Sequence, residues 1–230
     1  DFGLGNGINQ FDVDRPNRIL KLGDRFGYDY NLNITRASSW IQSVFKFNKL
    51  DFFVAGTLSQ TSFYRQGNIR NGIFPNDSYG KGTANSFLNY AGKAGVTYKI
   101  NGRNYVYVNG AYLTRAPYFE NVYISPRTRN AQQSDLQSEE ILSGEVAYVL
   151  NTPTIKARVG GYYTQFKNGM DVMVFYHDFY QNFVNYAIRG IDRLHFGGEL
   201  GLEVKLSPTV TLNAAAAIGR YYFDSKQQAV

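Results

Sequence analysis

Residues 194–206 read Leu-His-Phe-Gly-Gly-Glu-Leu-Gly-Leu-Glu-Val-Lys-Leu, with an apolar residue or glycine at every even position. The odd positions carry histidine, glycine and charged residues. Successive side chains of a β-strand point to opposite faces, so this stretch predicts a strand with one apolar and one polar face. It is longer than the usual soluble strand of about 5–6 residues. Its length suits a tilted strand that crosses a bilayer, which needs about 9–11 residues.

The same alternation recurs along the chain. We expect about eight antiparallel strands and leave open an extension of the sixth to about residue 180. They lie near residues 39–47, 52–64, 88–100, 105–114, 140–150, 155–166, 189–206 and 210–223. A half-buried sheet in water alternates in the same way. Charges, however, recur on one face of strand after strand, which suits a wet lumen better than a protein core.

The connections between these segments alternate between short and long. The short ones lie at residues 48–51, 101–104, 151–154 and 207–209, and the long ones at 65–87, 115–138 and 167–189. Outer-membrane barrels have short periplasmic turns and long extracellular loops. The fold class predicted is therefore all-β, a transmembrane antiparallel β-barrel. With the tight turns in the periplasm, the first strand descends and the eighth ascends, so we expect a segment of a larger barrel.

Composition agrees with this interpretation. The 230 residues include 19 Tyr and 17 Phe, many near predicted strand ends, where barrels carry aromatic girdles. The absence of Cys excludes disulfides and Cys metal sites. Mean hydropathy is −0.35, and no run of about 18 apolar residues predicts a spanning helix. The net charge of +6 is spread without a basic run, so we expect no nucleic-acid partner.

The polar residues of the predicted inner face are expected to form the lumen wall. They are Lys93, Lys156, Arg158, His195, Glu199 and Glu203. The last three could suggest a metal site, but four strand residues separate side chains by about 14 Å. Ligands of one ion must lie within about 2–2.6 Å of it. We expect no metal, no cofactor, no catalytic residue and no enzymatic activity.

The second long connection holds the best candidates for ligand binding. They are Arg115, Tyr118, Phe119, Tyr123, Arg127 and Arg129. Arginine donors and aromatic faces suit sugars, peptides or anionic chelates. Two other roles stay open: the aromatic rings can pack the loop base, and the arginines can contact lipopolysaccharide phosphates. Glu139 and Glu140 follow this loop, and we expect them to be solvated or paired with Arg127 and Arg129.

Residues 105–119, Tyr-Val-Tyr-Val-Asn-Gly-Ala-Tyr-Leu-Thr-Arg-Ala-Pro-Tyr-Phe, resemble the barrel of TonB-dependent outer-membrane receptors of the Bacteroidetes. Residues 91–98 resemble the strand before that turn, and residues 191–203 resemble the glycine- and glutamate-containing strand of these receptors. The resemblance covers roughly residues 25–223. It implies a 22-stranded barrel around a plug domain, and a TonB box that engages TonB–ExbB–ExbD. No plug or TonB box can be matched here, so residues 1–230 are expected to be one segment of a single barrel domain.

The resemblance also implies a function, the energised uptake of a scarce nutrient across the bacterial outer membrane. The implied partners are outer-membrane lipid and lipopolysaccharide, the TonB system through parts outside this segment, and a nutrient that the sequence does not identify. Whether a surface lipoprotein also binds stays open. Two alternatives remain: a small autonomous outer-membrane barrel that serves as an anchor or enzyme, and a soluble β-sandwich binding module.

Overall fold

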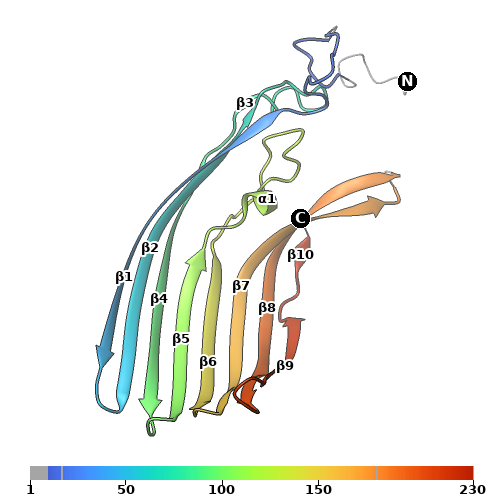
Figure 1. Ribbon diagram of the computed structural model, residues 1–230. Coiled ribbons are helices and arrows are strands. Elements are labelled where there is room, and N and C mark those ends of the chain that lie inside the picture. Colours follow the sequence, from blue (N-terminus) through green and yellow to red (C-terminus); the bar gives the residue numbers. More distant parts are fainter. Residues whose placement is uncertain (1–9, 17, 180, 230) are drawn as a thin grey trace.

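The computed structural model describes residues 10–16, 18–179 and 181–229, so the ends of the predicted 1–230 segment lie outside it. One curved antiparallel sheet dominates the fold (Figure 1). Its long strands follow in chain order: β1 (Tyr30–Lys46), β2 (Leu50–Gly67), β4 (Asn85–Lys99), β5 (Asn104–Arg115), β6 (Glu139–Asn151), β7 (Ile155–His177), β8 (Asn182–Lys205) and β9 (Thr211–Phe223). The short elements are β3 (Gly80–Lys81), α1 (Phe119–Val122) and β10 (Gln228–Ala229).

The eight predicted strands correspond to the eight long strands, which confirms the all-β antiparallel prediction. The tight connections meet at one end of the sheet, called here the turn end, which is the lower end in Figure 1. The opposite end is called the loop end. It carries residues 68–84 and residues 116–138, and the latter are called the cap segment.

The prediction of a long loop over residues 167–189 is wrong, whereas the extension of the sixth strand to about residue 180 is confirmed by β7, which ends at His177. β7 and β8 continue past the sheet as a paired hairpin, from Met170 opposite Arg189 to His177 opposite Asn182. The ladder shifts register near Gly169, and such a bulge changes which side chains share a face. The alternation therefore breaks in the sequence although the strands continue.

β1 also begins earlier than predicted, at Tyr30 instead of residue 39. Its first residues pair with the loop end of β2, from Tyr30 opposite Gly67. The early part of β1 places Asn31 and Asn33 on the otherwise apolar face, so it lacks the alternation by which the other strands are predicted.

The register aligns side chains in rows across the sheet, and the two faces differ in kind. One outward row runs through Val96, Val108, Val146 and Ile218. Val146 is 52% exposed and Ile218 is 81% exposed. A continuous apolar surface of this extent is unusual on a soluble monomer. It suits contact with lipid hydrocarbon, so this face is called the outer face.

The two alternatives from the sequence can be compared with this sheet. A β-sandwich needs a second sheet packed over the apolar face, but all strands of the described residues belong to a single sheet. A closed eight-stranded barrel needs β1 to pair with β9. In the described part of the chain, β1 pairs only with β2 and β9 only with β8. No helix among these residues is long and apolar enough to cross a membrane.

Candidate ligand site at the loop end

The cap segment is held against the sheet by Arg65 of β2, whose side chain is only 1% exposed. Its Nε donates to the carbonyl of Pro126 at 2.7 Å, and its Nη1 donates to the carbonyl of Ser78 at 2.9 Å and to Asn130 Oδ1 at 2.6 Å. A buried charge is costly unless hydrogen bonds replace its hydration. These bonds join both long loops to one strand.

Tyr123 lies fully inside a small core with Phe63 and Val122. Its hydroxyl accepts hydrogen bonds from the Arg65 backbone N–H at 2.9 Å and from Gln132 Nε2 at 3.2 Å. Burial raises the pKa of Tyr123, although these two hydrogen bonds act in the opposite direction. Tyr123 therefore anchors the cap segment and is out of reach of a ligand in this structure.

Two of the other predicted ligand residues stack on aromatic rings of neighbouring segments. The Arg127 guanidinium lies 5.2 Å from the ring centroid of Tyr28, and that of Arg129 lies 4.6 Å from the centroid of Phe74. Cation–π contacts of this kind stabilise the loop arrangement. Neither arginine meets Glu139, so the expected pairing is wrong.

The remaining three predicted ligand residues, Arg115, Tyr118 and Phe119, do come together. Arg115 Nη1 donates to the Tyr118 hydroxyl at 2.9 Å, and its guanidinium lies 4.7 Å from that ring's centroid. Tyr118 is nevertheless 59% exposed. All three line a cavity of about 470 Å³ on the inner face of β1, β2, β4 and β5. We call it the basic pocket. Its charged and polar lining residues include Arg36, Thr61, Asn89, Lys93, Arg115 and Tyr118.

A second cavity, of about 530 Å³, shares Arg115, Pro117 and Tyr118 with the basic pocket and extends toward β7 and β8. We call it the balanced pocket, because its charged lining residues are Arg115, Arg193, Glu139 and Asp171. Glu139 Oε1 accepts from Arg193 Nη2 at 2.8 Å, and Oε2 accepts from Arg115 Nη2. The carboxylate is 7% exposed, so its two partners offset the loss of hydration.

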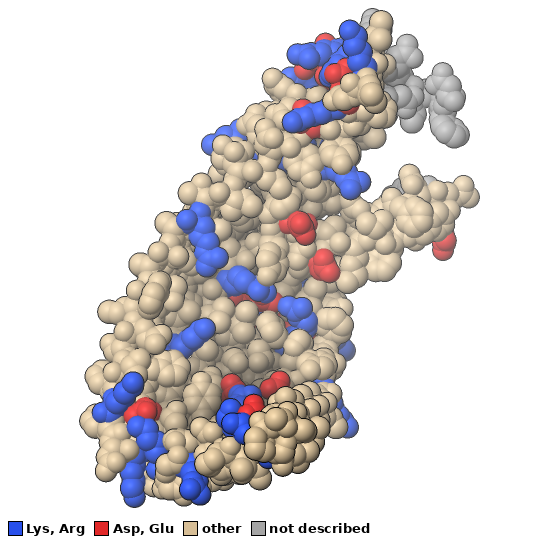
Figure 2. Space-filling view, in the orientation of Figure 1, with Lys and Arg blue, Asp and Glu red and all other residues tan. Residues whose placement is uncertain are grey.

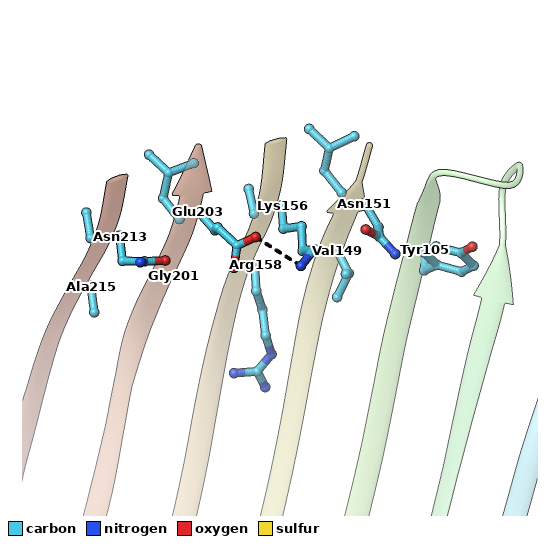
Figure 3. Close-up of a pocket in the computed structure, with 13 residues that line it drawn as sticks. Tyr105, Val149, Asn151, Lys156, Arg158, Gly201, Glu203, Asn213 and Ala215 are labelled. Carbon is cyan, nitrogen blue, oxygen red and sulfur yellow. Dashed lines mark ion pairs between the residues drawn. The ribbon is translucent and has the colours of Figure 1, made fainter. Parts of the chain in front are cut away.

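The predicted lumen-wall residues of β7 and β8 form ion pairs near the turn end. Lys156 Nζ lies 3.0 Å from Glu203 Oε1 (Figure 3). Arg158 pairs with Glu145, and its Nη1 lies 3.6 Å from Glu199 Oε2. Lys156, Arg158 and Glu203 line a shallow cavity of about 590 Å³ over the inner face of β5–β9. The charged side chains named here are thus paired with one another on this part of the inner face.

The other two predicted wall residues have different surroundings. The His195 ring lies between Phe166, at 5.1 Å, and Tyr221, which it meets edge-on at 4.9 Å. Lys93 lines the basic pocket, six positions along β4 from the turn-end residue Lys99. Across residues 10–16, 18–179 and 181–229, no group of three or more His, Asp or Glu side chains is placed to hold a metal ion.

Sequence reasoning missed Arg36, Glu139 and Arg193 as pocket residues. Arg193 directly precedes the alternating stretch 194–206 and has the odd parity of its polar face, so the pattern itself could have included it. Glu139 is in register with Arg115 on the neighbouring strand. Arg36 lies in the early part of β1, where the outward residues are polar, so the sequence carried no signal for it.

Comparisons with known proteins extend this description at the level of the fold. No protein-family model matches the chain, and no curated protein matches it. Several solved structures do, among them the copper transporter OprC (13% identity, TM-score 0.68), the ferric-catecholate import receptor Fiu from K12 E. coli (14%, 0.63) and the FrpB iron transporter from Neisseria meningitidis (15%, 0.57). The matches cover 86%, 88% and 86% of this chain, respectively.

The chain spans only 32%, 30% and 26% of the lengths of these three proteins. By their names, two of them are metal transporters and one is an import receptor. At such identities, the likeness concerns the fold alone. The curved antiparallel sheet therefore shares its fold with part of each of these proteins.

Proposed function

We propose that this chain forms part of the barrel wall of a TonB-dependent transporter in the outer membrane, of the Bacteroidetes type that the sequence resembles. The division of the sheet into two faces is the observation that carries the proposal. The outer face is apolar and exposed, and the inner face carries ion pairs and two polar cavities. A wall that separates lipid from a wet lumen needs this division.

The open edges of the sheet support a larger barrel. Every backbone polar group in hydrocarbon must be paired within the protein. In the described residues, β1 and β9 each have one edge without a strand partner. Further strands of the same protein would pair with these edges, and the loop end would face the cell exterior, as in barrels of this class.

The proposed mechanism assigns this segment the capture of a ligand and the guidance of its entry. A nutrient binds at the loop end, where both pockets open onto the inner face, and the TonB system then rearranges a plug elsewhere in the protein. The segment performs no chemistry on the nutrient. Lipid and lipopolysaccharide are the proposed contacts of the outer face, and a surface lipoprotein is a further candidate partner at the loops.

Nutrient uptake in living cells tests the proposal. We expect deletion of the gene and deletion of TonB to abolish accumulation of the same compound from the medium. Reintroducing the intact gene should restore uptake only in cells that retain TonB. Uptake that continues in either deletion strain would contradict the proposed transport function.

A further inference from the structure

The basic pocket differs from the rest of the inner face in its charge. Arg36, Lys93 and Arg115 line it, and no Asp or Glu side chain does. Arg115 already pairs with Glu139. Within the described residues, Arg36 and Lys93 form no ion pair. The pocket therefore holds positive charge that the sheet itself does not neutralise.

Three cations nearer the turn end, by contrast, are paired with carboxylates. Lys99 Nζ lies 2.6 Å from Asp51 Oδ1, and Lys156 pairs with Glu203. Arg158 has two carboxylate partners. In Figure 2, some red and blue side chains adjoin one another near the lower end of the sheet, while other blue ones, there and along the middle of its left side, have no red neighbour. These turn-end cations therefore have carboxylate partners that Arg36 and Lys93 lack.

The polar lining adds a second requirement for a ligand. The amide oxygen Oδ1 of Asn89 is buried and has no hydrogen-bond partner among the described residues. A buried acceptor without a partner is costly; if the amide turns toward the pocket that Asn89 lines, it can accept a hydrogen bond from a hydroxyl or N–H group of a ligand. Thr61 offers a further hydroxyl, and the exposed ring of Tyr118 offers an apolar face.

The register also constrains the length of the ligand. Arg36 lies opposite Thr61, and Lys93 lies opposite Ala55, six positions away on β2. At about 3.3 Å per residue, these levels are about 20 Å apart, a gap that the two long side chains shorten. A compact monoanion cannot contact both cations. The volume of about 470 Å³ is within the range of small-molecule sites.

We propose that the basic pocket binds an extended, hydroxyl-rich ligand with two or more acidic groups, which Arg36 and Lys93 contact at separate points. This inference rests on the proposed transport function and names its substrate class. The balanced pocket is the less suitable site for an anion. An acidic group there would have to displace Glu139 from Arg115 and Arg193 and leave a nearly buried carboxylate unpaired.

The test uses the complete receptor, purified in detergent, and two matched probes, trigalacturonic acid and its methyl ester. The probes share their hydroxyl groups and differ in charge. We expect saturable calorimetric binding of the acid, at least tenfold weaker binding of the ester, and a loss of about tenfold or more for the acid in each of Arg36→Gln and Lys93→Gln. Lys49→Gln, at the turn end, is the matched control and should bind as the wild type.

Two results would overturn the inference. One is the absence of saturable binding of the acid up to about 10 mM, or equal binding of acid and ester. The other is unchanged acid binding in Arg36→Gln and Lys93→Gln together with a lowered melting temperature, which would assign both cations to structural pairs with the rest of the barrel. Because this assay needs no TonB, it is separate from the uptake test. Acid binding without TonB-dependent uptake contradicts only the transport function, and uptake of a neutral nutrient contradicts only this site.

Discussion

The backbone N–H of Arg65 donates a hydrogen bond of 2.9 Å to the hydroxyl of Tyr123, 58 residues further along the chain. The bond joins a strand of the sheet to the cap segment, and the Arg65 side chain strengthens the join through Pro126 and Asn130. The position of Tyr118 and Phe119 over the basic pocket depends on this attachment, because they belong to the same segment.

Replacing Tyr123 by Phe should loosen the cap segment. The substitution keeps the ring in its core but leaves the Arg65 N–H without this acceptor and removes one of the two acceptors of the Gln132 amide. A buried donor left unpaired costs about 1–3 kcal/mol. Hydrogen exchange should show faster exchange in residues 116–138. The control is Tyr79→Phe, because the Tyr79 hydroxyl forms no hydrogen bond with a described residue, and this variant should leave hydrogen exchange unchanged. Equal hydrogen exchange in the two variants would contradict the anchoring role of Tyr123.

The cap segment should also weaken at high pH. Because burial raises the pKa of Tyr123, the folded state holds this proton more tightly than the unfolded state. Its contribution is complete below the unfolded pKa of about 10 and is lost as the pH rises through the folded pKa. Limited proteolysis of the cap segment between pH 8 and 11 should show this loss. In Tyr123→Phe the cleavage rate should depend less on pH, and identical profiles would contradict the prediction.

Neutralising Glu139 should destabilise the loop end. Glu139→Gln leaves Arg115 and Arg193 without the carboxylate they share. Breaking a buried pair costs about 3–5 kcal/mol, and the partial exposure of both arginines reduces the expected cost to about 2 kcal/mol. Urea unfolding in detergent measures the change. Glu120→Gln, at an exposed position of α1, is the control; an equal effect in both variants would assign no special role to Glu139.

The sequence predicted those parts of the fold that depend on local alternation. The stretch 194–206 and the segments on either side of the tight turns show a period of two because one face of the sheet is apolar and the other is polar. The hairpin beyond Gly169 could not be predicted, since a bulge shifts the parity there. The beginning of β1 could not be predicted either, because its outward residues are polar.

The site was predicted less completely, for a different physical reason. A residue's presence on the inner face follows from its parity, as for Lys93 and Arg158, but its partner depends on register between strands. Glu139 meets Arg115 and Arg193, not the nearby Arg127 and Arg129, because the cap segment turns Arg127 toward Tyr28 and Arg129 toward Phe74. Tyr123 anchors the cap segment because its hydroxyl accepts a hydrogen bond from the backbone N–H of Arg65, 58 residues away in the sequence. No local sequence pattern encodes such a contact.

A charge on the outer face should impair membrane insertion. Val54 faces outward on β2, in the row that crosses β5 near its middle at Gly110, and Val54→Arg should cost about 2–4 kcal/mol in a bilayer. Thr164→Arg on the inner face of β7 is the matched control, and we expect a much smaller cost because that side chain meets the wet lumen. Refolding into lipid vesicles, followed by the gel shift of the unheated protein, measures the folded fraction. Equal losses would contradict the assignment of the faces.

Gly169 should be required for the hairpin that extends β7 and β8 beyond the sheet. A Cβ atom at this position would lie 2.7 Å from the carbonyl oxygen of Ile191, a backbone atom that moves only with its strand. Gly169→Ala should therefore displace the bulge and raise hydrogen exchange in residues 170–189, while exchange at the turn end stays unchanged. Gly201→Ala is the control, because its Cβ would meet nothing within 4 Å. If hydrogen exchange in Gly169→Ala equals that of the wild type, the backbone at the bulge can shift enough to accept a side chain. The register of the hairpin is then held by the pairs from Met170 onward and not by the glycine.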